Sequence, residues 1–139
     1  MEFIPEWQVL NSLAVGEMAN GNAIGAAEYM RQAIRIAGNT RSLQETKATM
    51  QNYLASIYIS AGLIEEAEDI LREAIPFARA QRFLVLGDDL LMLAEIEQRR
   101  GNRAGAFTCA TEALKIFQAR GHSYGCEQAK QLIKSGLGV

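Results

Sequence analysis

The sequence is poor in residues that crosslink small domains or interrupt helices. Among 139 residues there are two cysteines, two prolines and one histidine. So few cysteines leave no disulfide framework to hold the fold, and so few prolines permit long helices. The sequence also lacks an excess of charge of either sign. It has 14 basic and 16 acidic residues, and no block of like charge occurs. A nucleic acid is therefore excluded as the main partner, since phosphate binding needs a basic face.

Long hydrophobic runs are absent as well. No apolar stretch approaches the roughly 20 residues that span a membrane, so we expect no membrane insertion. The N-terminal stretch carries Glu2 and Glu6 and no basic segment, which is unlike a secretory signal. Cys109 and Cys126 lie within helical patterns, where a free thiol packs as a small hydrophobic group. These features predict a cytoplasmic location.

A single histidine leaves little room for catalysis. His122 would have to serve any Ser-His-Asp or Cys-His arrangement, and its position predicts a turn between two helices instead. His122 and Cys126 are four residues apart, but they supply only two of the three or four ligands that zinc needs. We therefore predict no catalytic residues, no metal site and no cofactor, and an enzyme is the least favoured class.

What the sequence does contain is an amphipathic unit that occurs three times. The clearest copy, residues 61–78, has apolar residues at helical three- and four-residue spacing, and weaker copies occupy residues 20–37 and 100–117. A glycine near the start of each copy follows the previous one by 41 and then 39 residues, and two sets of alanines share these spacings. A period of this length indicates stacked helical hairpins.

The pattern predicts seven helices in one domain over residues 1–139. Their approximate ranges are 6–19, 23–37, 42–60, 63–78, 82–100, 103–119 and 123–135. They form repeats at about 6–38, 42–80 and 82–119, and the last helix caps the array. Ser42, with Glu45 three residues later, is expected to cap the third helix, and Leu13 is expected to lie inward. Pro76 is expected to bend or weaken the last turn of the fourth helix.

The middle unit resembles a tetratricopeptide repeat. It has the small, bulky and aromatic residues of that pattern at Leu54, Ala55, Tyr58, Gly62, Ala67, Leu71 and Ala74. The outer units keep the glycine and alanines, but Glu17 and Glu97 stand at the Tyr position and the closing proline is absent. The resemblance covers about residues 6–135. It implies an all-α fold, a right-handed superhelical stack of three antiparallel helix hairpins (an α-solenoid) with a C-terminal capping helix.

The resemblance also implies that the first helices of the hairpins line a concave groove for a protein or peptide. On this chain the groove positions are Asn11, Val15, Met18, Glu45, Thr49, Asn52, Ser56, Asp88, Leu91, Glu95 and Gln98. The basic clamp with which some members hold a C-terminal carboxylate is not visible. A scaffold or adaptor that binds a protein or peptide partner is therefore the expected function.

Two alternatives stay open. The chain could be a sensor or regulatory domain that binds a small signalling peptide or a metabolite. It could also be a self-associating module that forms homo-oligomers through the array ends, with Phe3, Ile4 and Trp7 at one end or Leu137 at the other.

Overall fold

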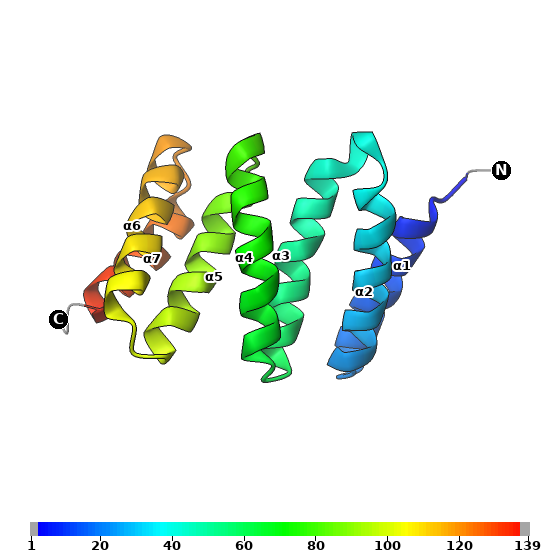
Figure 1. Ribbon diagram of the computed structural model, residues 1–139, viewed down its shortest axis with the longest axis horizontal. Coiled ribbons are helices and arrows are strands. Elements are labelled where there is room, and N and C mark those ends of the chain that lie inside the picture. Colours follow the sequence, from blue (N-terminus) through cyan, green and yellow to red (C-terminus); the bar gives the residue numbers. More distant parts are fainter. Residues whose placement is uncertain (1–2, 137–139) are drawn as a thin grey trace. The chain divides into compact units, whose positions relative to one another are not determined.

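The computed structural model describes residues 3–136, and all regular structure within them is helical (Figure 1). The elements are α1 (Glu6–Ala19), α2 (Ala23–Gly38), the short 3-10 helix η1 (Arg41–Leu43), α3 (Gln44–Ser60), α4 (Ile64–Gln81), α5 (Leu86–Arg99), α6 (Arg103–Ala119) and α7 (Ser123–Gly136). Consecutive helices pack against each other, α1 on α2, α2 on α3, α5 on α6 and α6 on α7. The predicted all-α fold of α-solenoid type is confirmed.

Contacts between residues group the chain into two compact units. Unit 1 ends at Ala74 and unit 2 begins at Ile75, so the boundary falls inside α4. Pro76 is the second residue of unit 2, and α4 continues past this proline to Gln81. The single domain and the right-handed superhelix stay predictions.

The start of α5 differs from the prediction. The helix begins at Leu86, and the range that starts at Arg82 is wrong. Arg82 adopts a left-handed backbone conformation (φ 58°), which stops α4, and the Phe83 N–H donates to the Ala78 carbonyl at 2.9 Å. The Phe83 ring also contacts Phe77 edge-on, with centroids 5.6 Å apart. Residues 82–85 are therefore a turn.

The predicted cap of α3 is also wrong. Ser42 lies inside η1, and the residue before α3 is Leu43, which makes no side-chain capping hydrogen bond. The Gln44 side-chain amide instead donates to the Thr40 carbonyl at 2.9 Å, and the Thr40 hydroxyl donates to the Ile36 carbonyl at 3.0 Å. These bonds satisfy the end of α2 and the connection that follows it.

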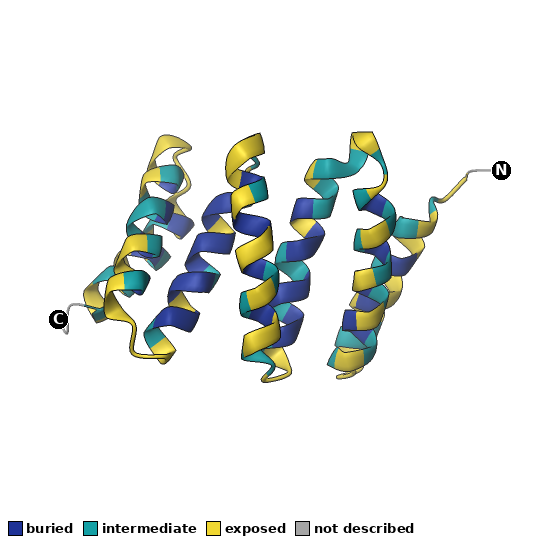
Figure 2. Cartoon of the chain, viewed as in Figure 1, coloured by how far each residue is buried: buried dark blue, intermediate teal, exposed yellow. Residues whose placement is uncertain are grey.

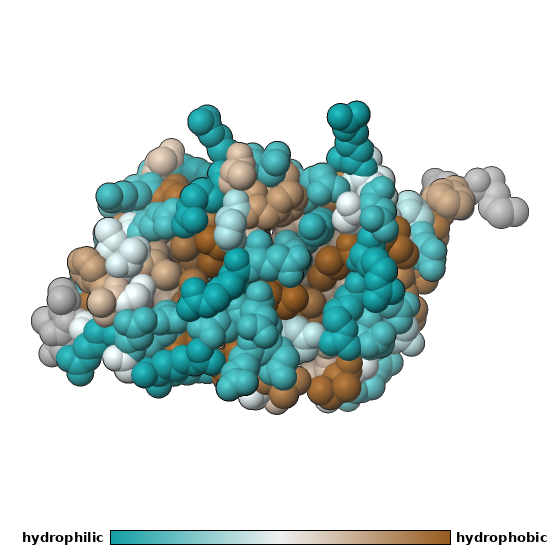
Figure 3. Space-filling view, in the orientation of Figure 1, coloured by the Kyte–Doolittle hydropathy of each residue, from teal (hydrophilic) through white to brown (hydrophobic). Residues whose placement is uncertain are grey.

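Buried small residues set the helix packing. Buried residues, dark blue in Figure 2, occur in every α-helix. The repeated alanines of the three hairpins are all among them, at Ala26, Ala33, Ala67, Ala74, Ala106 and Ala113. Helix α1 buries only Leu10 and Ala14. Leu13 is 43% exposed, contrary to the prediction, because the buried face of α1 is centred on Leu10 and Ala14. On the face shown in Figure 3, hydrophilic side chains cover much of the surface, with smaller hydrophobic areas between them.

The turns of the first and third hairpins are held by the same pattern of hydrogen bonds. The side-chain oxygen of Asn22 accepts from the Gly25 N–H at 3.0 Å, which caps α2, and its amide donates to the Glu17 carboxylate at 2.7 Å. Asn102 makes the same two bonds, to the Gly105 N–H and to the carboxylate of Glu97. A Cβ added at Gly105 would lie 2.5 Å from the Asn102 side-chain nitrogen, so this turn needs glycine.

The middle hairpin has none of the three residues, Glu, Asn and Gly, that form this turn in the other two hairpins. Tyr58, Leu63 and Glu66 stand where the other hairpins have Glu, Asn and Gly. The Tyr58 hydroxyl accepts from the Arg31 guanidinium of α2 instead. The two glutamates that depart from the repeat pattern in the sequence therefore have a structural reason, because each orients a capping asparagine.

Unit 2 has its own close contact at Phe117, which is buried. A Cβ added at Gly87 of α5 would lie 2.9 Å from the Phe117 ring, and one added at Gly125 of α7 would lie 2.5 Å from it. Phe117 thus fills the space that these two glycines leave open. No helix among residues 3–136 is both long enough and apolar enough to cross a membrane.

The turn of the third hairpin can be tested with a double-mutant cycle. Asn102→Ala should lower the free energy of unfolding by about 1–2 kcal/mol, because α6 loses its N-cap. Gly105→Ala should also destabilise the wild-type protein, since its methyl group would collide with Asn102. In the Asn102→Ala background the same change should cost less than in the wild type, because the contact at 2.5 Å is gone and only the Glu97 carboxylate, 3.0 Å from the added Cβ, must still shift. Urea denaturation measures all four proteins, and additive costs would contradict the shared contact.

Candidate functional site

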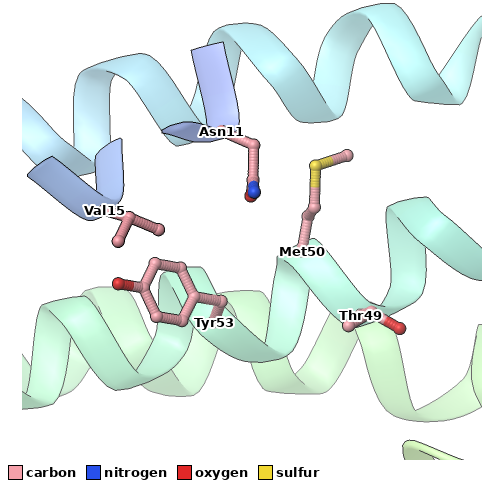
Figure 4. Close-up of a pocket in the computed structure, with 5 residues that line it drawn as sticks. All are labelled: Asn11, Val15, Thr49, Met50 and Tyr53. Atoms are coloured by element: carbon pink, nitrogen blue, oxygen red, sulfur yellow. The ribbon is translucent and has the colours of Figure 1, made fainter. Parts of the chain in front are cut away.

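A pocket of about 210 Å³ lies between α1 and α3 in unit 1 (Figure 4). Asn11 and Val15 line it from α1, and Thr49, Met50 and Tyr53 line it from α3. The side chains of Asn11 and Val15 point toward the space that Tyr53 and Met50 face from the other helix. The pocket is thus formed by the first helices of two successive hairpins.

Helix α2 supports both walls of the pocket, because it packs against α1 and also against α3. Asn11 and Val15 are one helical turn apart on α1, and Thr49 and Tyr53 are one turn apart on α3, so each pair lies on one face of its helix. The residues that α2 buries include Ala26, Met30 and Ala33. The scaffold under the site is therefore a three-helix unit.

The lining of the pocket is mainly apolar and carries no charge. Met50 is buried at 4% exposure, whereas Val15 is 49% exposed and forms part of the rim. The Asn11 amide and the hydroxyl groups of Thr49 and Tyr53 add polar atoms, and the Thr49 hydroxyl donates to the Glu45 carbonyl at 3.2 Å. A concave apolar surface with a few polar groups is typical of a ligand-binding site.

The structure brings together three of the predicted groove residues, Asn11, Val15 and Thr49. Four others belong to unit 1 without lining the pocket. Glu45 is exposed, and the partly buried ones are Met18, Asn52 and Ser56. The Ser56 hydroxyl donates to the Tyr53 carbonyl at 2.7 Å, so this group is used within α3.

Two lining residues were missed by the sequence analysis. Met50 and Tyr53 are not among the predicted groove positions, although Met50 follows the apolar pattern of α3. A signal for Tyr53 exists, because it continues the stripe from Thr49 to Ser56 at spacings of four and three residues. Following the whole stripe along α3 would have found it.

The remaining predicted residues lie on α5 in unit 2. Asp88 and Glu95 are exposed, Gln98 is partly buried, and Leu91 is only 7% exposed. They share one stripe of the helix at spacings of three and four residues. Leu91 offers little surface to a partner, and a binding role for this stripe stays a prediction.

Asp88 has an unusual electrostatic setting for a surface residue. Partial burial raises the pKa of its carboxyl group, while electrostatic interactions with His122 and Arg120 lower it and offset part of the rise. The Arg120 guanidinium donates to the Leu84 carbonyl at 2.8 Å, which holds it near the start of α5. Desolvation is the larger effect.

His122 lies in the turn before α7, as predicted. Its Nδ1 accepts from the Gly125 N–H at 2.9 Å and so caps the helix, and its ring lies 5.2 Å from that of Phe117. Cys109 and Cys126 are partly buried, and they are not joined in a disulfide. Within residues 3–136, no group of three or more His, Cys, Asp or Glu side chains is arranged to hold a metal ion.

The setting of Asp88 predicts a pH-dependent stability. The pKa of Asp88 is raised in the folded state. The contribution of Asp88 to the free energy of unfolding is therefore fully present below the unfolded-state pKa of about 4, and it is lost as the pH rises through the folded-state pKa. Asp88→Asn should therefore raise the melting temperature at about pH 7 and leave it nearly unchanged at about pH 3. Glu95→Gln, at an exposed carboxyl of the same helix, is the control. A gain for Asp88→Asn that is equal at both pH values would contradict the desolvation argument.

A comparison with family models places the site in context. The model described as tetratricopeptide repeat matches residues 48–80, which cover most of α3 and nearly all of α4 and include Tyr53 and Met50. No curated protein matches the chain. Repeats of this family are in general protein-interaction modules without catalytic activity. Residues 48–80 are thus similar to a tetratricopeptide repeat, which supports the resemblance predicted for the middle hairpin.

Proposed function

We propose that this chain is a scaffold or adaptor that binds a segment of a partner protein through the pocket between α1 and α3. One observation carries the proposal. Three residues that the repeat pattern assigns to a binding groove, Asn11, Val15 and Thr49, line a single pocket with Met50 and Tyr53. Their convergence supports a binding face on the first helices.

The outer surface of α2 has a different character. Arg31 and Glu28 form an ion pair at 2.6 Å on this helix, and both are largely exposed. The pKa of the Glu28 carboxyl is lowered, first by its hydrogen bond from Arg31. Charged groups that already pair with each other in solvent offer little to a partner. The uncharged pocket is the better binding surface of unit 1.

The size of the pocket favours a side chain of a partner protein over a metabolite as the ligand. Pockets for small-molecule ligands measure about 300–1,000 Å³, which is larger than the roughly 210 Å³ found here. A metabolite sensor is therefore less well supported than a protein that accepts one side chain of a longer segment. Cysteines that are not joined in a disulfide fit a reducing compartment, which is consistent with the proposed place in the cytoplasm.

Self-association is the second candidate function. Phe3 is 89% exposed and Ile4 is 61% exposed, so the N-terminal end presents apolar surface, whereas Trp7 is partly buried. Leu137, at the other end, lies outside the described residues. Sedimentation at increasing concentration would reveal such an assembly.

Site-specific photo-crosslinking tests the proposed binding face. A benzophenone amino acid at Val15, on the rim of the pocket, should crosslink to a partner polypeptide in cells that express the protein. The same group at Arg35, on the side of α2 opposite to its buried residues, should give no such product. Both positions are exposed, so neither change should disturb folding. Equal labelling from the two positions would refute a binding role for the pocket.

A further inference from the structure

We propose that the pocket selects a partner segment in which one large apolar side chain lies next to a basic residue. This inference rests on the proposed function and specifies its ligand. The apolar side chain enters the space between Asn11, Val15, Met50 and Tyr53, and the basic residue pairs with Glu45.

The dimensions and walls of the pocket favour one apolar side chain. A space of about 210 Å³ admits a single leucine, methionine or phenylalanine side chain. The thioether of Met50 adapts its shape and interacts well with aromatic rings, and the Tyr53 ring can contact another ring edge to face. Val15 adds methyl groups at the rim.

A charged side chain would be a poor occupant. None of the five lining residues is charged, and Met50 is almost fully buried. An ionised group that entered would lose water without gaining an opposite charge. The Asn11 amide, in contrast, has one acceptor and two donor positions and points into the pocket, so it can pair with a peptide group of the partner backbone (Figure 4).

Glu45 gives one end of the site a negative charge. It is exposed and lies one helical turn before Thr49 on the same face of α3. The side chain of Lys47, two residues further along, lies 3.6 Å from where a Cβ on Gly38 would be. A basic residue beside the apolar one would complement this charge and increase the rate of association.

The same argument excludes the apolar N-terminal segment of a second copy. Phe3 and Ile4 are exposed and apolar, but Glu2 and Glu6 flank them. Their acidic charges would repel Glu45. The favoured occupant is therefore a partner with a basic flank.

Peptide binding to the full chain tests this preference. The probes are fluorescein-labelled alanine–glycine peptides that carry Phe-Arg, Ala-Arg, Asp-Arg or Phe-Glu at the centre, and fluorescence anisotropy measures their affinity. Phe-Arg should bind tightest, and replacing Phe with Ala or Asp should weaken binding roughly tenfold to a hundredfold. Replacing Arg with Glu should weaken it about threefold to tenfold at low salt, and this difference should disappear at high salt.

Three variants locate the effects. Val15→Asp should abolish the preference for Phe, while Val9→Asp, at a residue of α1 with similar exposure (44%) that does not line the pocket, should leave it unchanged. Glu45→Gln should remove only the preference for Arg over Glu. Equal affinity for all four peptides, or an equal effect of the two valine changes, would overturn the inference. Crosslinking from Val15 to a partner would still support the proposed function in that case, so the two failures are distinguishable.

Discussion

The close approach of helices at buried alanines is the constraint on which this structure depends. At Ala26 and Ala33 of α2, a larger side chain would separate this helix from its neighbours. Because α2 packs against both α1 and α3, their spacing fixes the distance between the two walls of the pocket. The alanines that allow the helices to approach closely thus also determine the width of the pocket, although none of them lines it.

Most helix boundaries could be predicted because their causes are local. The glycines at the turns and the three- and four-residue spacing of apolar positions are visible in the sequence, and α1 and α6 have the predicted bounds. The start of α5 could not be predicted in this way. It depends on a left-handed conformation at Arg82, which is unusual for a residue other than glycine, and on the contact of Phe83 with Phe77. These are properties of the folded chain.

The site was predictable as a stripe of positions and not as a cavity. The repeat pattern assigns one face of α1 and α3 to a groove, and Asn11, Val15 and Thr49 on that face line the pocket. Whether such positions enclose a space depends on the neighbouring side chains. Met50 is at once part of the interior and part of the pocket lining, and Tyr53 closes the space from the same helix. A periodicity argument assigns each residue to one face only and therefore misses these double roles.

The exchange of a capping cluster for the bond between Tyr58 and Arg31 changes how neighbouring repeats depend on each other. In the outer hairpins, Glu17 and Glu97 stabilise a turn within their own repeat. Tyr58 instead bonds to a residue 27 positions away in the preceding hairpin. The stability of a repeat array is approximately the sum of the intrinsic stabilities of its repeats and the interaction energies between neighbouring repeats. The bond between Tyr58 and Arg31 adds to the interaction energy between two repeats, whereas the Glu–Asn bonds add to the intrinsic stability of one repeat. Stronger coupling makes it harder for one repeat to unfold alone, so α2 and α3 should open together and protect their amide hydrogens from exchange to a similar degree.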